Sequence, residues 1–204
     1  MEKQPSRDRI PAPEAAPSID FLDENLVVSF SLEEGAANYL PEVSPEDLES
    51  RRERYRIFLG THTVAADGSV HLQIKGTMEM DGDDHGFYKE AAKEITDIKM
   101  DKILREVKGI QQTYPEYRDF HLVGDIHTHP FKPSEFEGGI SPWDPSQPDI
   151  ASVADLYRLG LLSSTQPFIF GIAGPEENGE TQYSFFRITK NVDGQYGCKN
   201  VTAK

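Results

Sequence analysis

The stretch Gly124-Asp125-Ile126-His127-Thr128-His129-Pro130, followed by Asp144-Pro145-Ser146-Gln147-Pro148-Asp149-Ile150, carries the strongest signal in this chain. Two histidines two positions apart on a strand point to the same face, because side chains alternate along a strand. Both imidazoles can then reach one metal ion, and a carboxylate from the following segment can supply a third ligand. Three protein ligands with one open position are typical of a hydrolytic zinc site. The stretch therefore predicts a catalytic zinc centre.

Strands and helices are interspersed on both sides of this stretch. Apolar patterning and turn residues predict strands at 25–31, 55–64, 70–74, 120–127, 167–173 and 181–189. A short helix is expected through Ala36, Ala37 and Leu40. Further helices are expected from the N-cap Ser44 to about Glu53 or Arg54, over 87–112 as the longest helix, and over 149–162. This order predicts an α/β (α+β) class, with a mixed curved sheet flanked by helices.

The domain organisation follows from composition. Residues 1–20 are rich in Pro, Ala and charge and are expected to be a disordered tail, because they cannot bury enough apolar surface to offset ordering. Residues 21–195 form the predicted catalytic domain, and residues 196–204 are expected to be a C-terminal tail. With 204 residues the chain is long enough for one domain with a substantial core.

Charge and cysteine content limit the classes of binding partner and the cellular compartment that we expect. The formal net charge of −14 argues against nucleic-acid binding, which needs a basic face. Cys198 is the one cysteine, so an intrachain disulfide and a Cys-rich structural zinc site are both excluded. The sequence offers no apolar run of about 20 residues and no signal-peptide core, so we expect no membrane span and a cytoplasmic protein. Its oligomeric state cannot be predicted.

The third metal ligand has two candidates, each in a Ser-x-x-Asp pattern. One pattern is Ser141 to Asp144, and the other is Ser146 to Asp149. We favour Asp149 because a helix start fixes a side chain better than a Pro-rich loop does, and Asp144 is the alternative. Ordinary helix capping by Ser146 and Asp149 is the competing interpretation. The histidines at 62, 71, 85 and 121 have no comparable partner and are expected to be structural or surface residues.

These residues resemble the JAMM/MPN metalloproteases, also called JAB-domain isopeptidases. The family pattern is an upstream glutamate, then His-Ser/Thr-His-Pro, then Ser-x-x-Asp. Here His127-Thr128-His129-Pro130 and Ser146-Gln147-Pro148-Asp149 match it, and Glu53 precedes an apolar strand that ends in Gly60. The resemblance covers roughly residues 24 to 190. It implies a three-layer, cytidine-deaminase-like architecture.

The resemblance also implies roles for individual residues. His127, His129 and Asp149 would bind zinc, and Ser146 would help to hold the water or the developing oxyanion. Glu53 would be the general acid/base, with Glu49 and Glu79 as alternatives and a plain solvated charge as the competing interpretation.

Two departures from the family pattern stand out. Residues 131–143 are longer than the compact family loop, and their side chains Phe131, Phe136, Ile140 and Trp143 either grip an extended peptide or pack down. Arg54 and Arg56 follow Glu53 where the family often has small residues.

The implied reaction is hydrolysis of an isopeptide or peptide bond after the C-terminal glycine of a ubiquitin-like modifier. The alternatives are a non-catalytic scaffold or binding module of the same fold, and a zinc hydrolase acting on a small-molecule amide. Amidohydrolase barrels typically need about 250 residues, and this chain is shorter. Metallo-β-lactamase-like enzymes continue into a further Asp-His pair, whereas Pro130 and Phe131 follow here. A zinc deaminase would need a Cys-x-x-Cys pair, which one cysteine excludes.

Overall fold

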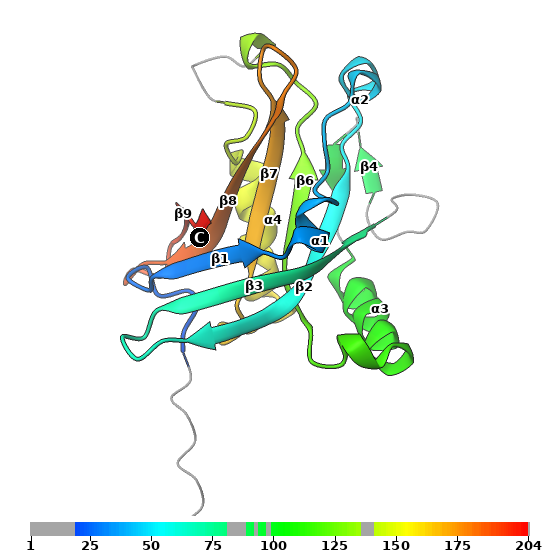
Figure 1. The fold of residues 1–204 in the computed structure, drawn as a ribbon. Coiled ribbons are helices and arrows are strands. Elements are labelled where there is room, and N and C mark those ends of the chain that lie inside the picture. Colours follow the sequence, from blue (N-terminus) through cyan, green and yellow to red (C-terminus); the bar gives the residue numbers. More distant parts are fainter. Residues whose placement is uncertain (1–18, 81–88, 92–93, 97–98, 136–140, 204) are drawn as a thin grey trace, which may run out of the picture.

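An eight-stranded mixed sheet forms the centre of the computed structural model, which describes residues 19–80, 89–91, 94–96, 99–135 and 141–203 (Figure 1). The strand order is β10-β1-β3-β2-β6-β7-β8-β9. The strands are β1 (Val28–Leu32), β2 (Tyr55–Val64), β3 (Val70–Glu79), β6 (His121–Thr128), β7 (Ile169–Pro175), β8 (Thr181–Lys190), β9 (Tyr196–Asn200) and β10 (Thr202–Ala203). A separate antiparallel pair consists of β4 (Lys89–Ala91) and β5 (Glu94–Thr96).

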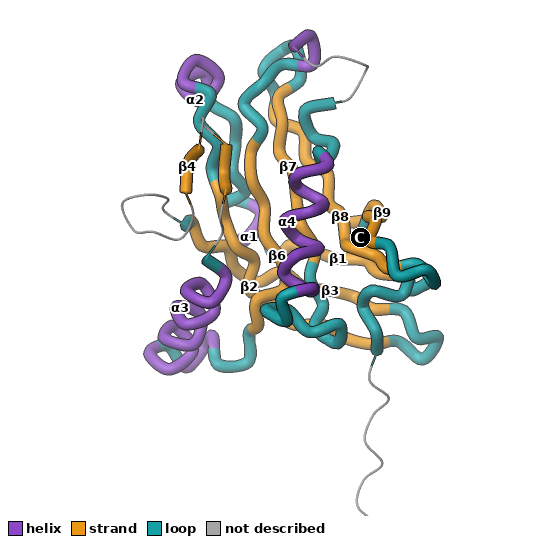
Figure 2. The backbone as a smooth tube through the Cα atoms, turned by 180° about the vertical axis from the view of Figure 1, so that it is seen from behind, coloured by secondary structure: helices purple, strands orange, loops and turns teal. Residues whose placement is uncertain are grey.

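Helices lie on both faces of the sheet. They are α1 (Glu34–Ala37), α2 (Pro45–Ser50), α3 (Met100–Thr113) and α4 (Gln147–Arg158), with single 3-10 turns η1 (Pro115–Tyr117) and η2 (Pro133–Glu135). Seen from behind, α4 runs along the sheet over β6 and β7 and α3 lies beside it at lower left, while α1 is on the opposite face (Figure 2). The mixed α/β class expected from the sequence is confirmed.

The core is divided by the sheet into two apolar layers. One layer joins α3 and α4 to the sheet and includes Ile57, Ile103, Leu156 and Phe170. The other joins α1 to the opposite face and includes Phe30, Phe58, Leu72 and Ile126. Strand β7 is buried along its whole length, which explains its almost uniformly apolar sequence.

Strand β6 lies in the middle of the sheet, antiparallel to β2 and parallel to β7. In this register His127 is opposite Tyr55 on one side and Ile172 on the other. Tyr55 and Ile172 both belong to the layer that α4 covers, so His127 points toward α4. The register therefore places the histidine strand under the beginning of that helix.

Two helices begin as the sequence predicts. Ser44 and Ser146 are N-caps, each with an aspartate three residues later that completes a capping box, and each with proline in the first turn. Helix α2 ends at Ser50, earlier than expected, and Arg51 follows it in the left-handed region. Strand β3 continues to Glu79, beyond the predicted end at Ile74.

Two predictions about element boundaries were wrong. The helix expected over 87–112 is present only as α3, and its predicted first half contains β4 and β5 instead. The C-terminal tail expected at 196–204 contains β9, which pairs with β8, and β10, which pairs with β1. Residues 1–18, most of the predicted tail, lie outside the described residues.

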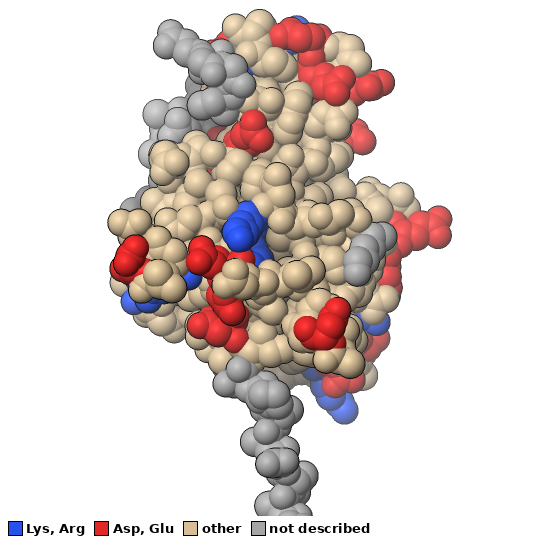
Figure 3. Space-filling model, turned by 90° about the vertical axis from the view of Figure 1, so that its left-hand side faces the viewer, with Lys and Arg blue, Asp and Glu red and all other residues tan. Residues whose placement is uncertain are grey.

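Acidic side chains are spread over the face drawn in Figure 3 and surround a basic group near its centre. Among the described residues on that face, no continuous basic surface is seen. In the described part of the chain, no helix is long and apolar enough to cross a membrane.

Candidate metal centre

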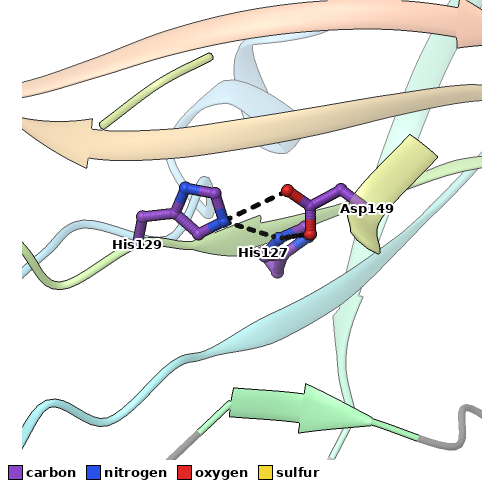
Figure 4. A group of neighbouring side chains, drawn as sticks. All are labelled: His127, His129 and Asp149. Atoms are coloured by element: carbon purple, nitrogen blue, oxygen red, sulfur yellow. Dashed lines mark hydrogen bonds and ion pairs between the residues drawn. The ribbon is translucent and has the colours of Figure 1, made fainter. Parts of the chain in front are cut away.

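Three side chains meet at the end of β6, where the helix α4 begins (Figure 4). The Nε2 atoms of His127 and His129 are 3.1 Å apart. Asp149 directs Oδ1 to His127 Nε2 at 3.2 Å and Oδ2 to His129 Nε2 at 3.5 Å. Among the described residues, these three side chains form the one group of three or more potential ligands that could hold a metal ion.

The backbone explains why these three side chains converge. His127 is on β6, and His129 follows directly, with its N–H donating to the carbonyl of Ala173 in β7 at 2.8 Å. Asp149 is the third residue of α4, where its Oδ2 accepts the N–H of Ser146 at 2.7 Å. One carboxylate therefore completes the capping box and also faces both imidazoles.

The spacing of the donor atoms fits a metal ion. Ligands about 2.0–2.1 Å from a tetrahedral zinc ion lie about 3.3 Å from one another. The two Nε2 atoms are 3.1 Å apart, and the two oxygens of Asp149 lie 3.2 and 3.5 Å from one imidazole each. One ligand atom from each residue can be chosen so that all three lie within 4.8 Å of one another. Two imidazoles and one carboxylate also form the donor set of many hydrolytic zinc sites, which leave a fourth position open. The side chains present are thus suited to zinc in both spacing and type.

A backbone carbonyl fixes the orientation of His129. Its Nδ1 lies 2.9 Å from the carbonyl oxygen of Pro142, so the ring donates there and leaves Nε2 free to act as ligand. Pro142 sits against Gly174 of β7: a Cβ built on Gly174 would lie 2.5 Å from Pro142 Cβ and 2.8 Å from its carbonyl oxygen. Only glycine at position 174 allows the turn to come this close.

The electrostatics favour a positive charge among these side chains. Burial works to lower the pKa of His127, but the hydrogen bond and charge of Asp149, with the charges of Glu53 and Asp125, raise it to about 9. Burial works to raise the pKa of Asp149, yet its hydrogen bonds to His127 and His129 hold it well below the usual range. A protonated His127 would balance part of the negative charge of Asp149, Glu53 and Asp125.

Glu53 lies beside this group. It is 6% exposed, and its negative charge contributes to the raised pKa of His127. It precedes Tyr55 by two residues, and Tyr55 is the residue that pairs with His127 across β2 and β6. Of the alternatives, Glu49 is exposed on α2, and Glu79 forms a salt bridge with Arg56 at 2.5 Å. Glu53 is therefore the glutamate that lies near the histidines, whereas Glu49 is exposed and Glu79 is paired with Arg56.

The two Ser-x-x-Asp patterns have different surroundings. Asp144 closes a turn, with its Oδ2 accepting the N–H of Ser141 at 3.2 Å, and it is not part of the donor group. Ser146 is exposed at the N-cap of α4, and its Oγ accepts the N–H of Asp149 at 3.3 Å. Of the two aspartates, Asp149 is the one that the structure brings to both histidines.

The four remaining histidines are apart from this donor group where they are described. His71 lies between the hydroxyls of Ser29 and Ser31, 3.0 Å from each, and His62 and His121 are exposed. His85 lies outside the described residues.

The sequence did not predict a buried hydrogen-bonded pair, Asp125 and Tyr55, next to His127. Asp125, two residues before His127 on the same face, accepts a hydrogen bond of 2.8 Å from the hydroxyl of Tyr55. Burial raises the pKa of Asp125 to about 6, against the lowering effects of Tyr55 and His127. The alternation of β6 signalled Asp125, because residues 125 and 127 must share a face. A backbone acceptor such as Pro142 leaves no signal in a sequence.

The aromatic side chains expected in the 131–143 segment are only partly described. Phe131 is half-buried, with the guanidinium of Arg51 5.0 Å above its ring centroid, and Trp143 is half-buried as well. Phe136 and Ile140 lie outside the described residues. Phe131 is therefore packed against Arg51.

Neither a family model nor a curated relative matches the chain. The solution structure of a protein from Salinibacter ruber (strain DSM 13855) is similar, with a TM-score of 0.37 and 13% identity. That similarity covers 80% of this chain and 92% of the other.

Proposed function

We propose that this chain is a JAMM-type zinc metalloprotease that hydrolyses the isopeptide or peptide bond after the C-terminal glycine of a ubiquitin-like modifier. The observation that carries the proposal is the convergence of His127, His129 and Asp149 at ligand spacing, with the buried Glu53 beside them. Ligands and an adjacent carboxylate are the two parts that a hydrolytic zinc site needs.

The resemblance to the JAMM/MPN pattern supplies the substrate class in this proposal. We also propose the three-layer architecture of that family, since apolar layers lie on both sides of the sheet. The formal net charge of −14 argues against a nucleic-acid substrate, whose phosphates it would repel.

In this mechanism His127, His129 and Asp149 would hold the zinc ion. A zinc ion held by these residues would supply Lewis-acid polarisation of the substrate carbonyl and a water whose pKa is lowered toward about 7. Glu53 accepts the proton of the attacking water and later delivers it to the leaving amine. Its burial beside His127 suits this role, because a carboxylate shielded from solvent interacts strongly with groups close to it.

Ser146 has a supporting role in the proposal. Its hydroxyl stands at the first turn of α4, close in sequence to the ligand Asp149, and would donate a hydrogen bond to the developing oxyanion. The same hydroxyl caps the helix by accepting the N–H of Asp149, so its oxygen is held in place while its proton stays available to donate.

The proposal is tested by cleavage of a ubiquitin-like protein that carries a short C-terminal extension. Wild type, Glu53→Gln and His129→Ala are compared at measured zinc content, with Glu49→Gln as the control for loss of an exposed acid. We expect about one zinc per chain in wild type and in both glutamate variants. Cleavage should fall at least about 100-fold in Glu53→Gln and stay unchanged in Glu49→Gln.

Each other outcome has a definite meaning. Zinc binding without cleavage of any modifier fusion would point to a binding module, or to a hydrolase for small-molecule amides if an amide substrate is turned over. Full activity in Glu53→Gln would remove the acid/base role of Glu53. Failure of wild type to bind zinc would overturn the proposal.

A further inference from the structure

Arg51 has an unusual backbone conformation directly before the Glu53 segment. Arg51 follows α2 with φ 59° and ψ 34°, in the left-handed region. Among the described residues, no other non-glycine residue has a positive φ. Glycine or asparagine usually occupies this position after a helix, because other side chains are strained there. This outlier directs attention to the contacts of the Arg51 side chain.

The side chain of Arg51 binds the loop that follows the two histidines. Its Nη1 donates to the carbonyl of Pro130 at 2.9 Å and to Glu135 Oε2 at 2.8 Å, and its Nη2 binds Glu135 Oε1. The same guanidinium lies over the ring of Phe131. Glu135 is itself held, because it accepts the N–H of Lys132 at 2.8 Å. Arg51 thus makes a bidentate ion pair, a backbone hydrogen bond and a ring contact with one short loop.

Residues on both sides of Glu53 in the sequence contact the two residues that flank His129. Before Glu53, Arg51 binds the carbonyl of Pro130, the residue after His129. After Glu53, the N–H of Arg54 donates to Thr128 Oγ1 at 2.9 Å, and the carbonyl of Arg54 accepts the N–H of Thr128 at 3.0 Å. The segment that carries Glu53 is therefore fastened to both neighbours of His129.

We propose that Arg51 is a positioning residue that holds the carboxylate of Glu53 in register with the metal centre through the Pro130 carbonyl and Glu135. This inference rests on the proposed function. His129 has its own anchors in the carbonyls of Ala173 and Pro142, so Arg51 acts on Glu53 and leaves zinc binding unchanged. A displacement of about 1 Å at a catalytic group can cost about 100-fold in rate.

The competing explanation is that Arg51 only ends α2 and makes a surface ion pair. Exposed ion pairs contribute little to stability, and the side chains of Arg51 and Glu135 are 32% and 36% exposed. Under that explanation Arg51→Gly would be neutral or favourable, since glycine relieves the left-handed backbone. Under ours, the same variant folds well and loses activity.

The test uses the zinc-loaded full chain and the fusion substrate described above. Arg51→Gly and Arg51→Gln should lower kcat at least about 10-fold, with KM and zinc affinity within about 3-fold of wild type. Arg51→Lys should recover part of kcat, because one donor can still reach Pro130 or Glu135. The matched control is Arg105→Gln, which removes an exposed arginine from its ion pair with Asp101. A wild-type kcat in Arg51→Gly, or a KM change that accounts for the whole loss, would overturn the proposal.

A second readout separates this inference from the proposed function. The carboxyl carbon resonance of Glu53 in the zinc-loaded protein, assigned by its loss in Glu53→Gln, reports the surroundings of that group without any turnover. It should shift in Arg51→Gly and stay in place in Arg105→Gln. If wild type cleaves no modifier fusion but the resonance shifts, the proposed function fails and the positioning role stands. An unmoved resonance in Arg51→Gly would contradict the positioning role.

Discussion

The ring Nδ1 of His129 donates to the carbonyl oxygen of Pro142 at 2.9 Å, across a turn that rests on Gly174. This hydrogen bond selects the tautomer that presents Nε2 toward His127 and Asp149. The orientation of His129 in the candidate metal centre therefore depends on Gly174 of β7, which supplies none of the donor atoms.

Gly174→Ala should weaken metal binding without altering any ligand. The new Cβ would approach Pro142 Cβ to 2.5 Å and its carbonyl carbon to 2.6 Å, which forces the turn and its acceptor away from His129. Loss of such an outer acceptor typically lowers metal affinity by about 10–100-fold. Competition with a chromophoric chelator measures the change.

Gly76→Ala is the matched control for that experiment. A Cβ at Gly76 would have the Tyr117 ring as its nearest neighbour, at 3.9 Å, which is an ordinary contact. Equal zinc affinity in both variants would show that the Pro142 acceptor does not orient His129.

Zinc binding should release protons below about pH 9. The pKa of His127 is raised from 6.5 to about 9, so the imidazole is protonated at pH 7.5 and must lose its proton to bind metal. In the metal-free chain, the ion pair between protonated His127 and Asp149 stabilises the fold. This contribution is fully present below pH 6.5 and is lost as the pH rises through about 9. Affinity for zinc should therefore increase with pH across the same range. Calorimetry at pH 7.5 in buffers of different ionisation enthalpy counts the protons, and an absence of release would contradict the raised pKa.

Asp149→Asn should abolish tight metal binding, whereas Asp144→Asn should have little effect. An asparagine at 149 still offers an oxygen to the N–H of Ser146, so the helix cap is largely kept while the anionic ligand is lost. We expect a fall of at least about 100-fold in zinc affinity for Asp149→Asn, and a change within about 3-fold for Asp144→Asn. Similar losses in the two variants would reopen the choice of third ligand.

Much of the site could be predicted because its geometry follows local rules. Alternation along β6 places His127 toward α4, and the capping box of Ser146 and Asp149 fixes where that helix begins. Strand β2 was predicted with its observed bounds, since its apolar run ends at a clear turn signal. What the sequence could not provide were contacts between distant segments, such as Pro142 with Gly174 and Arg51 with Pro130.

The wrong element predictions have physical causes of the same kind. Ala91 and Ile95 are four residues apart, which fits a helix, but the chain places them in two short paired strands. Short apolar runs are ambiguous between helix and strand, and pairing decides between them. Residues 196–200 carry few apolar side chains, and they form a strand because β8 offers an edge to pair with.

Arg187→Met should destabilise the fold, because the buried Arg187 side chain hydrogen-bonds to the backbone of residues 21–26. Its side chain is buried and donates to the carbonyls of Phe21, Asp23 and Leu26 at 3.0, 3.0 and 2.7 Å. Without these donors, we expect a loss of about 3 kcal/mol in the free energy of unfolding, measured by urea denaturation. Arg105→Met, at an exposed position, should change it by less than about 0.5 kcal/mol. A loss as small in Arg187→Met as in this control would show that the buried donors contribute nothing.

The central claim is a metal centre made of His127, His129 and Asp149, and zinc X-ray absorption of the zinc-loaded full chain tests it most directly. We predict one zinc per chain with two imidazole nitrogens at about 2.0–2.1 Å, oxygen ligands at about 2.0–2.2 Å, and loss of this signature in His129→Ala. Sulfur scattering at about 2.3 Å would assign the zinc to Cys198, and an unchanged spectrum in His129→Ala would place it elsewhere in the chain. Either result would contradict a metal centre made of His127, His129 and Asp149.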